Sequence, residues 1–312
     1  MRGAMVAVAQ MGPIVKDETR QSAVARMMDL LKEAKARGSD FIVFPELALT
    51  TFFPRWIYEP GEADLEAWYE DEMPNAATQP LFDAAKAAGI GFYLGYAERA
   101  GNRRFNTSIL VDRGGAIVGK YRKVHLPGHA EPDSSRKGEH LEKRYFDVGN
   151  LGFPVFETMD GRFGMAICND RRWPETYRVM GLQGVELVAL GYNTPVGLGE
   201  PFQANALSNF HNSLTMQAGA YHNACWVAAA AKCGCEEGFD MIGQSMIISP
   251  NGEIVAQAAT LEDEVITARC DFDAAQYAKQ EIFNFAIHRR TEAYGLIVER
   301  TGAGDPLPPV KE

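Results

Sequence analysis

A single cysteine stands where an apolar segment gives way to polar and charged residues. The segment 164–167 is Gly-Met-Ala-Ile, Cys168 follows it, and 169–172 is Asn-Asp-Arg-Arg. This pattern predicts a buried strand with a thiol at its tip, which is where ligands bind in α/β sheets. Most free cysteines are small core residues, so a catalytic role for Cys168 depends on partners elsewhere in the chain.

A cysteine nucleophile reacts as the thiolate and therefore needs a base. Histidine is the usual base, but a carboxylate can also serve when burial raises its pKa towards neutrality. Glu46 follows Pro45 at the end of the apolar segment 41–44, so we expect it at a strand tip, as for Cys168. The alternative is a carboxylate that caps the following loop, and Glu46 alone does not decide between the two.

Acyl transfer also requires a positive charge and N–H donors where the oxyanion forms. Lys123 follows a hairpin expected over 106–121 and could point into such a site. The alternative is that Lys123 is a solvated residue of the basic segment 120–123.

The elements that would position these residues recur in two similar halves of the chain. The hairpin segment 108–118 matches 245–255 without a gap. The strands that precede the hairpins also correspond, and the pairs are 41–46 with 185–190 and 91–98 with 225–231. Other expected elements are a strand over 5–10 and helices over 19–37, 64–69, 79–88, 174–183 and 205–220.

Two similar half-chains predict an α/β fold in which two sheets pack together and helices lie outside. We expect a single pseudo-symmetric domain over 1–312, with a core over about 5–271. The residues over about 272–312 have no counterpart in the other half. They are expected to form a C-terminal extension that packs on a neighbouring subunit.

Length and composition are typical of a soluble globular protein. The chain has 312 residues, of which 46% are hydrophobic and 23% charged. The formal net charge of −10 argues against nucleic acid or an anionic membrane surface as a partner. No apolar run has the length of a spanning helix and no signal peptide is evident, so we expect a cytoplasmic protein.

The cysteines argue against a disulfide framework and against a zinc site. Five cysteines are an odd number in a long chain without a secretion signal. Cys233 and Cys235 are too close together and too isolated to be zinc ligands. We therefore expect no metal and no cofactor.

Three short motifs, considered together, resemble those of a known family. They are Phe44-Pro45-Glu46, the segment 120–126 (Lys-Tyr-Arg-Lys-Val-His-Leu) and Ile167-Cys168-Asn169-Asp170, and they resemble the Glu, Lys and Cys motifs of the nitrilase superfamily of carbon–nitrogen hydrolases. The resemblance covers Met5 to about Asp271. It implies a four-layer α-β-β-α sandwich and a homodimer or homotetramer.

Other segments narrow the resemblance to the N-carbamoyl-D-amino acid amidohydrolases. These segments are 47–56, 104–108, 140–146, 168–175 and 191–195. In that branch the arginines after the cysteine and an Asn-Thr pair face the substrate, which implies substrate contacts for Asn169, Arg171, Arg172, Asn193 and Thr194. One arginine would bind a carboxylate, and for the other a salt bridge with Asp170 or Glu175 is an alternative. The histidines that match His125 and His140 would support the substrate site.

The combined prediction is hydrolysis of an N-carbamoyl-D-amino acid to the D-amino acid, ammonia and carbon dioxide. Glu46 would be the base and Cys168 the nucleophile that forms a thioester. Lys123 and the Asn169 backbone N–H would stabilise the oxyanion. Glu142 would orient Lys123 or the substrate amide; its alternative role is a partner for Lys143 or Arg144.

Two alternatives remain open at this point. The first is another hydrolase of the same superfamily, acting on a β-ureido acid, a carbamoyl amine or a simple amide. The second is a non-catalytic protein that keeps the fold, against which the intact set of Glu46, Lys123 and Cys168 argues.

Overall fold

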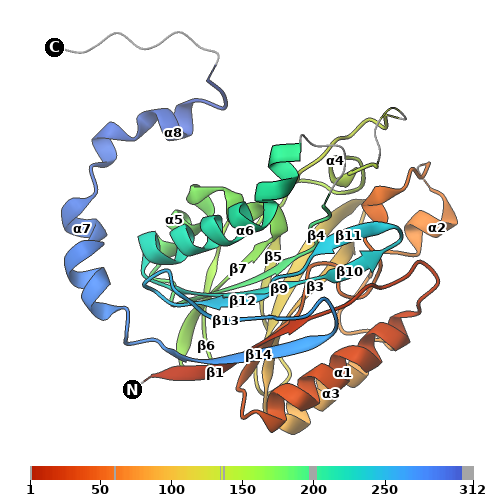
Figure 1. Cartoon of the computed structure of the whole chain (residues 1–312), viewed down its shortest axis with the longest axis horizontal. Helices are drawn as coiled ribbons and strands as arrows, with labels where there is room; N and C mark the ends of the chain where they lie inside the picture. Colours follow the sequence, from red (N-terminus) through yellow and green to blue (C-terminus); the bar gives the residue numbers. More distant parts are fainter. Residues whose placement is uncertain (1, 60, 134, 136–137, 197–201, 304–312) are drawn as a thin grey trace.

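The computed structural model describes the chain apart from residues 1, 60, 134, 136–137, 197–201 and 304–312. Two six-stranded sheets pack face to face, and helices cover their outer faces (Figure 1). The arrangement is the predicted four-layer α-β-β-α sandwich. Within the described ranges, no helix combines the length and the apolar character that a membrane-spanning segment needs.

The first sheet has the strand order β14-β1-β2-β3-β4-β5. Its strands are β1 (Gly3–Gln10), β2 (Phe41–Val43), β3 (Gly91–Ala100), β4 (Arg103–Val111), β5 (Ile117–Arg122) and β14 (Glu264–Asp271). Strands β1, β2 and β3 are parallel, and the other neighbours pair antiparallel. The three parallel strands therefore end at the same edge of the sheet.

The second sheet has the order β13-β12-β9-β8-β7-β6. Its strands are β6 (Val155–Thr158), β7 (Gly161–Ile167), β8 (Leu187–Tyr192), β9 (Trp226–Ala231), β12 (Met246–Ile248) and β13 (Ile254–Gln257). A separate two-stranded hairpin consists of β10 (Cys233–Glu236) and β11 (Phe239–Ile242).

The two sheets repeat one plan, as the internal sequence match predicted. Strands β1 to β5 correspond in order and direction to β7, β8, β9, β12 and β13. The β4–β5 pairing shifts register between Leu110 and Val111, and the β12–β13 pairing shifts between Ile247 and Ile248. These two irregularities occupy equivalent positions of the matched segments, so the similarity extends to a local detail of the backbone.

Helices α1 (Arg20–Ala36) and α3 (Gln79–Ala88) cover the first sheet, while α5 (Pro174–Leu182) and α6 (Phe202–Asn223) cover the second (Figure 1). The layers follow from the two-residue period of the strands. In β1, Val6 and Val8 belong to the core between the sheets, whereas Ala7 and Ala9 pack in the core beneath α1 and α3. Each sheet therefore has two buried faces.

Short helical segments lie at the strand ends and in the loops. They are η1 (Phe53–Arg55), α2 (Ala63–Glu66), α4 (Glu142–Tyr145) and η2 (Cys168–Arg172). Near the C-terminus follow η3 (Ala278–Ile282), α7 (Phe285–His288), η4 (Thr291–Ala293) and α8 (Gly295–Glu299), and this segment extends away from the sandwich (Figure 1). The division into a core and an extension over 272–312 stays a prediction, and 304–312 lie outside the described residues.

The strands differ from expectation where tertiary pairing outweighs local pattern. Strand β2 ends at Val43 instead of residue 46, and Glu46 lies in the turn that follows. Strands β6, β10, β11 and β14 had not been predicted. The Gly-rich and Glu-rich segment 233–238 lacks an alternating apolar pattern, and β14 is fixed by its eight-residue pairing with β1.

Candidate active site

A buried cluster of three charged side chains lies where the parallel strands of the first sheet end. Glu46, Lys123 and Glu142 have no exposed surface. The Lys123 Nζ lies 2.6 Å from the Glu46 Oε1 and 2.6 Å from the Glu142 Oε2. The structure thus brings together two carboxylates and the lysine between them, and Lys123 is not a solvated residue of a basic segment.

Two glycines allow the Glu46 backbone to pass between the sheets. A Cβ atom on Gly95 of β3 would lie 2.8 Å from the Glu46 Cα, and one on Gly191 of β8 would lie 2.5 Å from the Glu46 backbone nitrogen. Real Cβ atoms do not come that close to backbone, so both positions need glycine. Because each sheet contributes one of these glycines, the position of Glu46 depends on both sheets.

Asn106 of β4 is a member of the cluster that the sequence had not indicated. Its Nδ2 donates to the Glu46 Oε1 at 2.7 Å and lies 3.4 Å from the Glu142 Oε2. Among the described residues, the other oxygen of Glu46, Oε2, is buried and has no hydrogen-bond partner. Asn106 and Lys123 therefore hold one oxygen and leave the second available for proton transfer.

Burial and charge set the protonation of the cluster. Burial raises the pKa of Glu46, the Lys123 charge opposes this, and the Glu142 charge adds to it, so the pKa is above its usual value. Burial would also raise the pKa of Glu142, but Lys123 and His140 outweigh it and hold the pKa at about 2. Burial acts to lower the pKa of Lys123, and Glu142, Glu46 and Cys168 raise it above its usual value.

His140 and Glu142 are linked at the start of α4. The His140 Nε2 lies 2.9 Å from the Glu142 Oε1, while the other Glu142 oxygen accepts from Lys123. Both oxygens of Glu142 are therefore engaged, and Glu142 is suited to orient Lys123. His140 therefore contacts Glu142, and its implied support of the substrate site stays a prediction. The alternative pairing of Glu142 with Lys143 or Arg144 does not occur among the described ion pairs.

Cys168 is the first residue of η2 and directly follows β7. Its φ of 46° lies in the left-handed region that non-glycine residues rarely adopt, and such strain clusters at functional sites. Cys168 as a residue is 3% exposed. Its Sγ lies 3.5 Å from the Arg171 Nη1 and 3.6 Å from the Thr194 Oγ1. It lies 3.9 Å from the Asn193 carbonyl oxygen. The predicted residues Arg171, Asn193 and Thr194 thus surround the thiol.

Asp170 fixes the turn that presents the thiol. Its fully buried carboxylate accepts from the backbone N–H of Ile167 at 3.0 Å and from the Tyr121 hydroxyl at 2.8 Å. It also accepts from the backbone N–H of His125 at 3.1 Å, and the His125 Nδ1 lies 2.8 Å away. His125 therefore supports the turn through Asp170.

The remaining predicted residues lie on the outer side of this turn. Asn169 Nδ2 donates to the His125 carbonyl at 3.1 Å, and the exposed Arg172 donates to the Asn169 Oδ1 at 3.0 Å. Arg171 is buried instead, with 1% exposure. Among the described ion pairs, neither arginine pairs with Asp170 or Glu175, so the salt bridge considered as an alternative is absent there.

Asn193 combines deep burial with an unused amide. Its side chain has no exposed surface, and within the described part of the chain neither its Oδ1 nor its Nδ2 has a hydrogen-bond partner. Leaving a buried polar group unpaired is costly. A donor and an acceptor are therefore unused at Asn193, whose backbone carbonyl oxygen lies 3.9 Å from the Cys168 Sγ.

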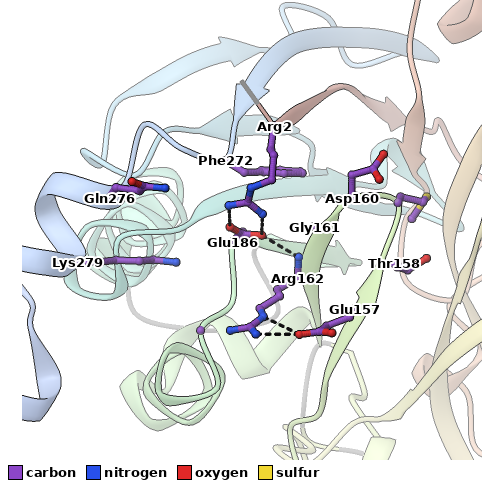
Figure 2. Close-up of a pocket in the computed structure, with 12 residues that line it drawn as sticks. Arg2, Glu157, Thr158, Asp160, Gly161, Arg162, Glu186, Phe272, Gln276 and Lys279 are labelled. Carbon is purple, nitrogen blue, oxygen red and sulfur yellow. Dashed lines mark hydrogen bonds and ion pairs between the residues drawn. The ribbon is translucent and has the colours of Figure 1, made fainter.

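A second cavity, of about 700 Å³, lies at the opposite ends of the strands (Figure 2). Two ion pairs lie in its lining: Arg2 lies 2.7 Å from Glu186, and Arg162 lies 2.8 Å from Glu157. The first pair joins the beginning of the chain to the second sheet. Across the described residues, no group of three His, Cys, Asp or Glu side chains is arranged to hold a metal ion.

The comparisons with known proteins agree with this architecture. The family model for carbon-nitrogen hydrolases matches residues 5–280. A nitrilase from Pyrococcus abyssi is 30% identical over 290 residues, covering 93% of this chain and 98% of the relative. An N-carbamoylputrescine amidase from Arabidopsis thaliana is 30% identical, covering 89% and 91%, and a citrullinase from Francisella tularensis is 30% identical, covering 96% and 100%.

A solved structure supports the fold independently. The carbon-nitrogen hydrolase from Helicobacter pylori G27 superposes with a TM-score of 0.83 at 21% identity, covering 96% of this chain and 99% of the other. The predicted resemblance to the superfamily is confirmed, and the activity that follows at this level is hydrolysis of a carbon–nitrogen bond. With the family model spanning most of the sequence, the chain belongs to the carbon-nitrogen hydrolase family of the nitrilase superfamily.

Proposed function

We propose that the protein hydrolyses a ureido compound, R–NH–CO–NH₂, with one water to the amine R–NH₂, carbon dioxide and ammonia. The observation that carries this proposal is the buried Glu46–Lys123–Glu142 cluster, which is close enough to Cys168 for the thiol to influence the pKa of Lys123. The cluster offers a base with one unpartnered oxygen and a fixed positive charge. These are the groups that a cysteine nucleophile requires.

The reaction would begin with proton transfer from the Cys168 Sγ to the Glu46 Oε2. The thiolate then attacks the ureido carbon, and the carbonyl oxygen gains the negative charge. The Lys123 ammonium and the Asn169 backbone N–H stabilise this oxyanion. Glu46 returns the proton to the leaving nitrogen, which breaks the carbon–nitrogen bond and leaves a thioester on Cys168.

Hydrolysis of the thioester would use the same base. Glu46 takes a proton from water, the resulting hydroxide attacks the thioester carbon, and the sulfur leaves as the thiolate, which regains the proton from Glu46. The carbamic acid that is released breaks its remaining carbon–nitrogen bond to give carbon dioxide and the second nitrogen product. The raised pKa of Glu46 makes this carboxylate a stronger base for the thiol proton and the water proton than an ordinary glutamate.

Asn193 supports a ureido or amide ligand. Its unpartnered Oδ1 can accept from an NH₂ group and its unpartnered Nδ2 can donate to a carbonyl oxygen. A ligand that lacked this donor–acceptor pair would leave the buried amide unsatisfied, which costs affinity.

Within the ureido class, an N-carbamoyl-D-amino acid remains the first predicted substrate, on the segments that resemble that branch. Its carboxylate would need a cation, and the exposed Arg172 is the candidate of the two arginines because most donors of Arg171 are already bonded to protein atoms. An N-carbamoyl amine or citrulline is the second candidate, favoured by the names of two relatives.

Ammonia release from a substrate panel separates these candidates. The panel contains N-carbamoyl-D- and L-amino acids, N-carbamoyl-β-alanine, N-carbamoylputrescine, citrulline and simple aliphatic amides. Turnover of any ureido compound well above the amides supports the proposal, and the preferred member assigns the substrate. Turnover of simple amides alone would overturn the ureido assignment.

A further inference from the structure

Arg171 is held in the interior by four different groups beside the nucleophile. Its Nε donates to the Asn212 Oδ1 of α6 at 2.9 Å, and its Nη2 donates to the Thr194 Oγ1 at 3.0 Å. Its Nη1 donates to the Cys168 carbonyl at 2.7 Å and lies 3.5 Å from the Cys168 Sγ. The guanidinium also lies 4.7 Å from the centre of the Tyr192 ring.

Within the described part of the chain, no carboxylate lies at ion-pair distance from this buried cation. Among the described residues, Arg171 forms no ion pair within 4.0 Å, although burying a charge without a counter-charge is expensive. The group in contact with Arg171 that can become an anion in the reaction is the Cys168 thiol. Most of the donors of Arg171 are already bonded to protein atoms, so a bidentate carboxylate would have to displace them.

Arg171 adds a second positive charge to the groups around the thiol. Before proton transfer, Glu46 and Glu142 carry two negative charges against the one positive charge of Lys123. After transfer, the Cys168 thiolate replaces Glu46 as the second negative charge. In both states Arg171 supplies a positive charge beside the Cys168 sulfur, and the proton transfer itself leaves the total charge of these five residues unchanged.

We propose that Arg171 stabilises the Cys168 thiolate and, through the Cys168 carbonyl, holds the left-handed backbone of the nucleophile, with Asn212 keeping the guanidinium in place. This inference rests on the proposed role of Cys168. The titratable and charged groups around Cys168 and Arg171 come from several elements. They are Glu46 after β2, Lys123 after β5, Glu142 of α4, Asp170 of η2, Tyr177 of α5 and Tyr192 of β8.

The test measures the reactivity of Cys168 without any substrate. Iodoacetamide, which is uncharged, alkylates the thiolate, and mass spectrometry of peptides identifies the site. We expect Arg171→Met to move the pH profile of Cys168 alkylation upward by about one unit, so that the rate on its acid limb falls about tenfold. Arg171→Lys keeps the charge and should recover most of this rate. The profile belongs to the coupled Glu46–Cys168 pair.

Arg178→Met serves as the matched control. Arg178 is a partly buried arginine of α5 that donates to the His222 carbonyl. Its substitution also removes a positive charge, but from a side chain that has no described contact with Cys168. We expect its alkylation profile to match that of the wild type. An unchanged profile in folded Arg171→Met, checked by thermal unfolding, overturns the proposal, as does an equal shift in Arg178→Met.

A second measurement separates this role from carboxylate binding. If Arg171 acts on the thiolate, Arg171→Met lowers kcat by a similar factor for an uncharged ureido substrate and for one with a carboxylate. A loss confined to the carboxylate substrate would instead assign Arg171 to substrate binding. Failure of the proposed function has a different signature, namely wild-type turnover confined to simple amides, whatever the alkylation profile of Cys168.

Discussion

The Asn106 Nδ2 donates to the same Glu46 oxygen that accepts from Lys123, at 2.7 Å, and the other Glu46 oxygen stays unpartnered among the described residues. A hydrogen bond to a charged group contributes about 1.5–3 kcal/mol. We therefore expect Asn106→Ala to lower kcat by about 10- to 150-fold, because Glu46 loses one of the two bonds that aim its free oxygen.

Ser108→Ala is the control for this substitution, because Ser108 is a buried residue of the same strand whose hydroxyl contacts Met165, away from Glu46. Steady-state kinetics of the two variants, with thermal unfolding as a check on folding, measure the difference. Equal losses in both variants would show that the effect comes from disturbance of β4.

Cys168→Ala should abolish turnover and leave the fold intact, since it removes only the sulfur from a small side chain. Cys225→Ala is the matched control: Cys225 is also buried, and burial raises its pKa to about 12, which keeps it a thiol at neutral pH. Ammonia release by the two variants decides the assignment. Residual activity in Cys168→Ala, or an equally inactive Cys225→Ala, would show that the nucleophile is misassigned.

Glu46→Gln and Lys123→Met should each reduce kcat by on the order of 100- to 1000-fold, the usual cost of removing one group that stabilises the transition state. Because the two residues contact each other at 2.6 Å, the double variant should be little worse than the more damaged single variant. A double-mutant cycle on kcat/KM measures this coupling, and full additivity would separate the two residues functionally.

Acid should destabilise the protein partly through Glu142. Burial would raise the pKa of this carboxyl, but Lys123 and His140 hold it at about 2, below its ordinary value of 4.5. The stability that follows is present above pH 4.5 and is lost as the pH falls towards 2; for one such group it amounts to about 3 kcal/mol.

Glu142→Gln should therefore be less stable than the wild type at neutral pH and show a flatter decline in the free energy of unfolding between pH 4.5 and 2. Urea unfolding at several pH values measures the slope. Glu157→Gln is the control, because the side chain of Glu157 is 75% exposed and its pairing with Arg162 lies at the surface. Parallel slopes for the wild type and Glu142→Gln would contradict the role of Glu142.

The homodimer or homotetramer implied by the sequence stays a prediction, and the outer helix layers indicate where to test it. Helices α5 and α6 expose large apolar side chains, including Leu182 and Leu214, whereas no described residue of α1 or α3 does so. We expect Leu182→Glu with Leu214→Glu to lower the mass measured by light scattering, and Lys32→Glu on α1 to leave it unchanged. A monomeric wild-type protein would refute the prediction.

Glu46, Lys123 and Cys168 each follow a strongly apolar strand or a hairpin with a clear turn, but that pattern left alternatives open, and the combined resemblance to the superfamily motifs selected them. Local pattern is informative there, since the end of a buried strand is visible in the sequence. The internal repeat was also visible, because matched hairpins leave a gap-free similarity. Strand β14 was missed because its pairing with β1 joins segments more than 250 residues apart.

The supporting residues could not be found in the same way. Asn106 lies 60 positions from Glu46, and Asp170 lies 49 positions from Tyr121, so their bonds exist only after the sheets have packed. The burial of Arg171 depends on Asn212, 41 positions away on α6. In the sequence, the neighbouring Asp170 and Glu175 suggested a salt bridge. The burial of the Arg171 guanidinium follows only from the position of α6.

The passage of Glu46 between Gly95 of the first sheet and Gly191 of the second has a consequence for folding. Although the halves share one plan, Glu46 and Lys123 come from one half and Cys168 and Thr194 from the other. Neither half holds a complete set of reacting groups. During refolding, regain of catalysis should therefore coincide with docking of the two sheets and lag behind the formation of either sheet. Enzyme activity would then report the final assembly step directly.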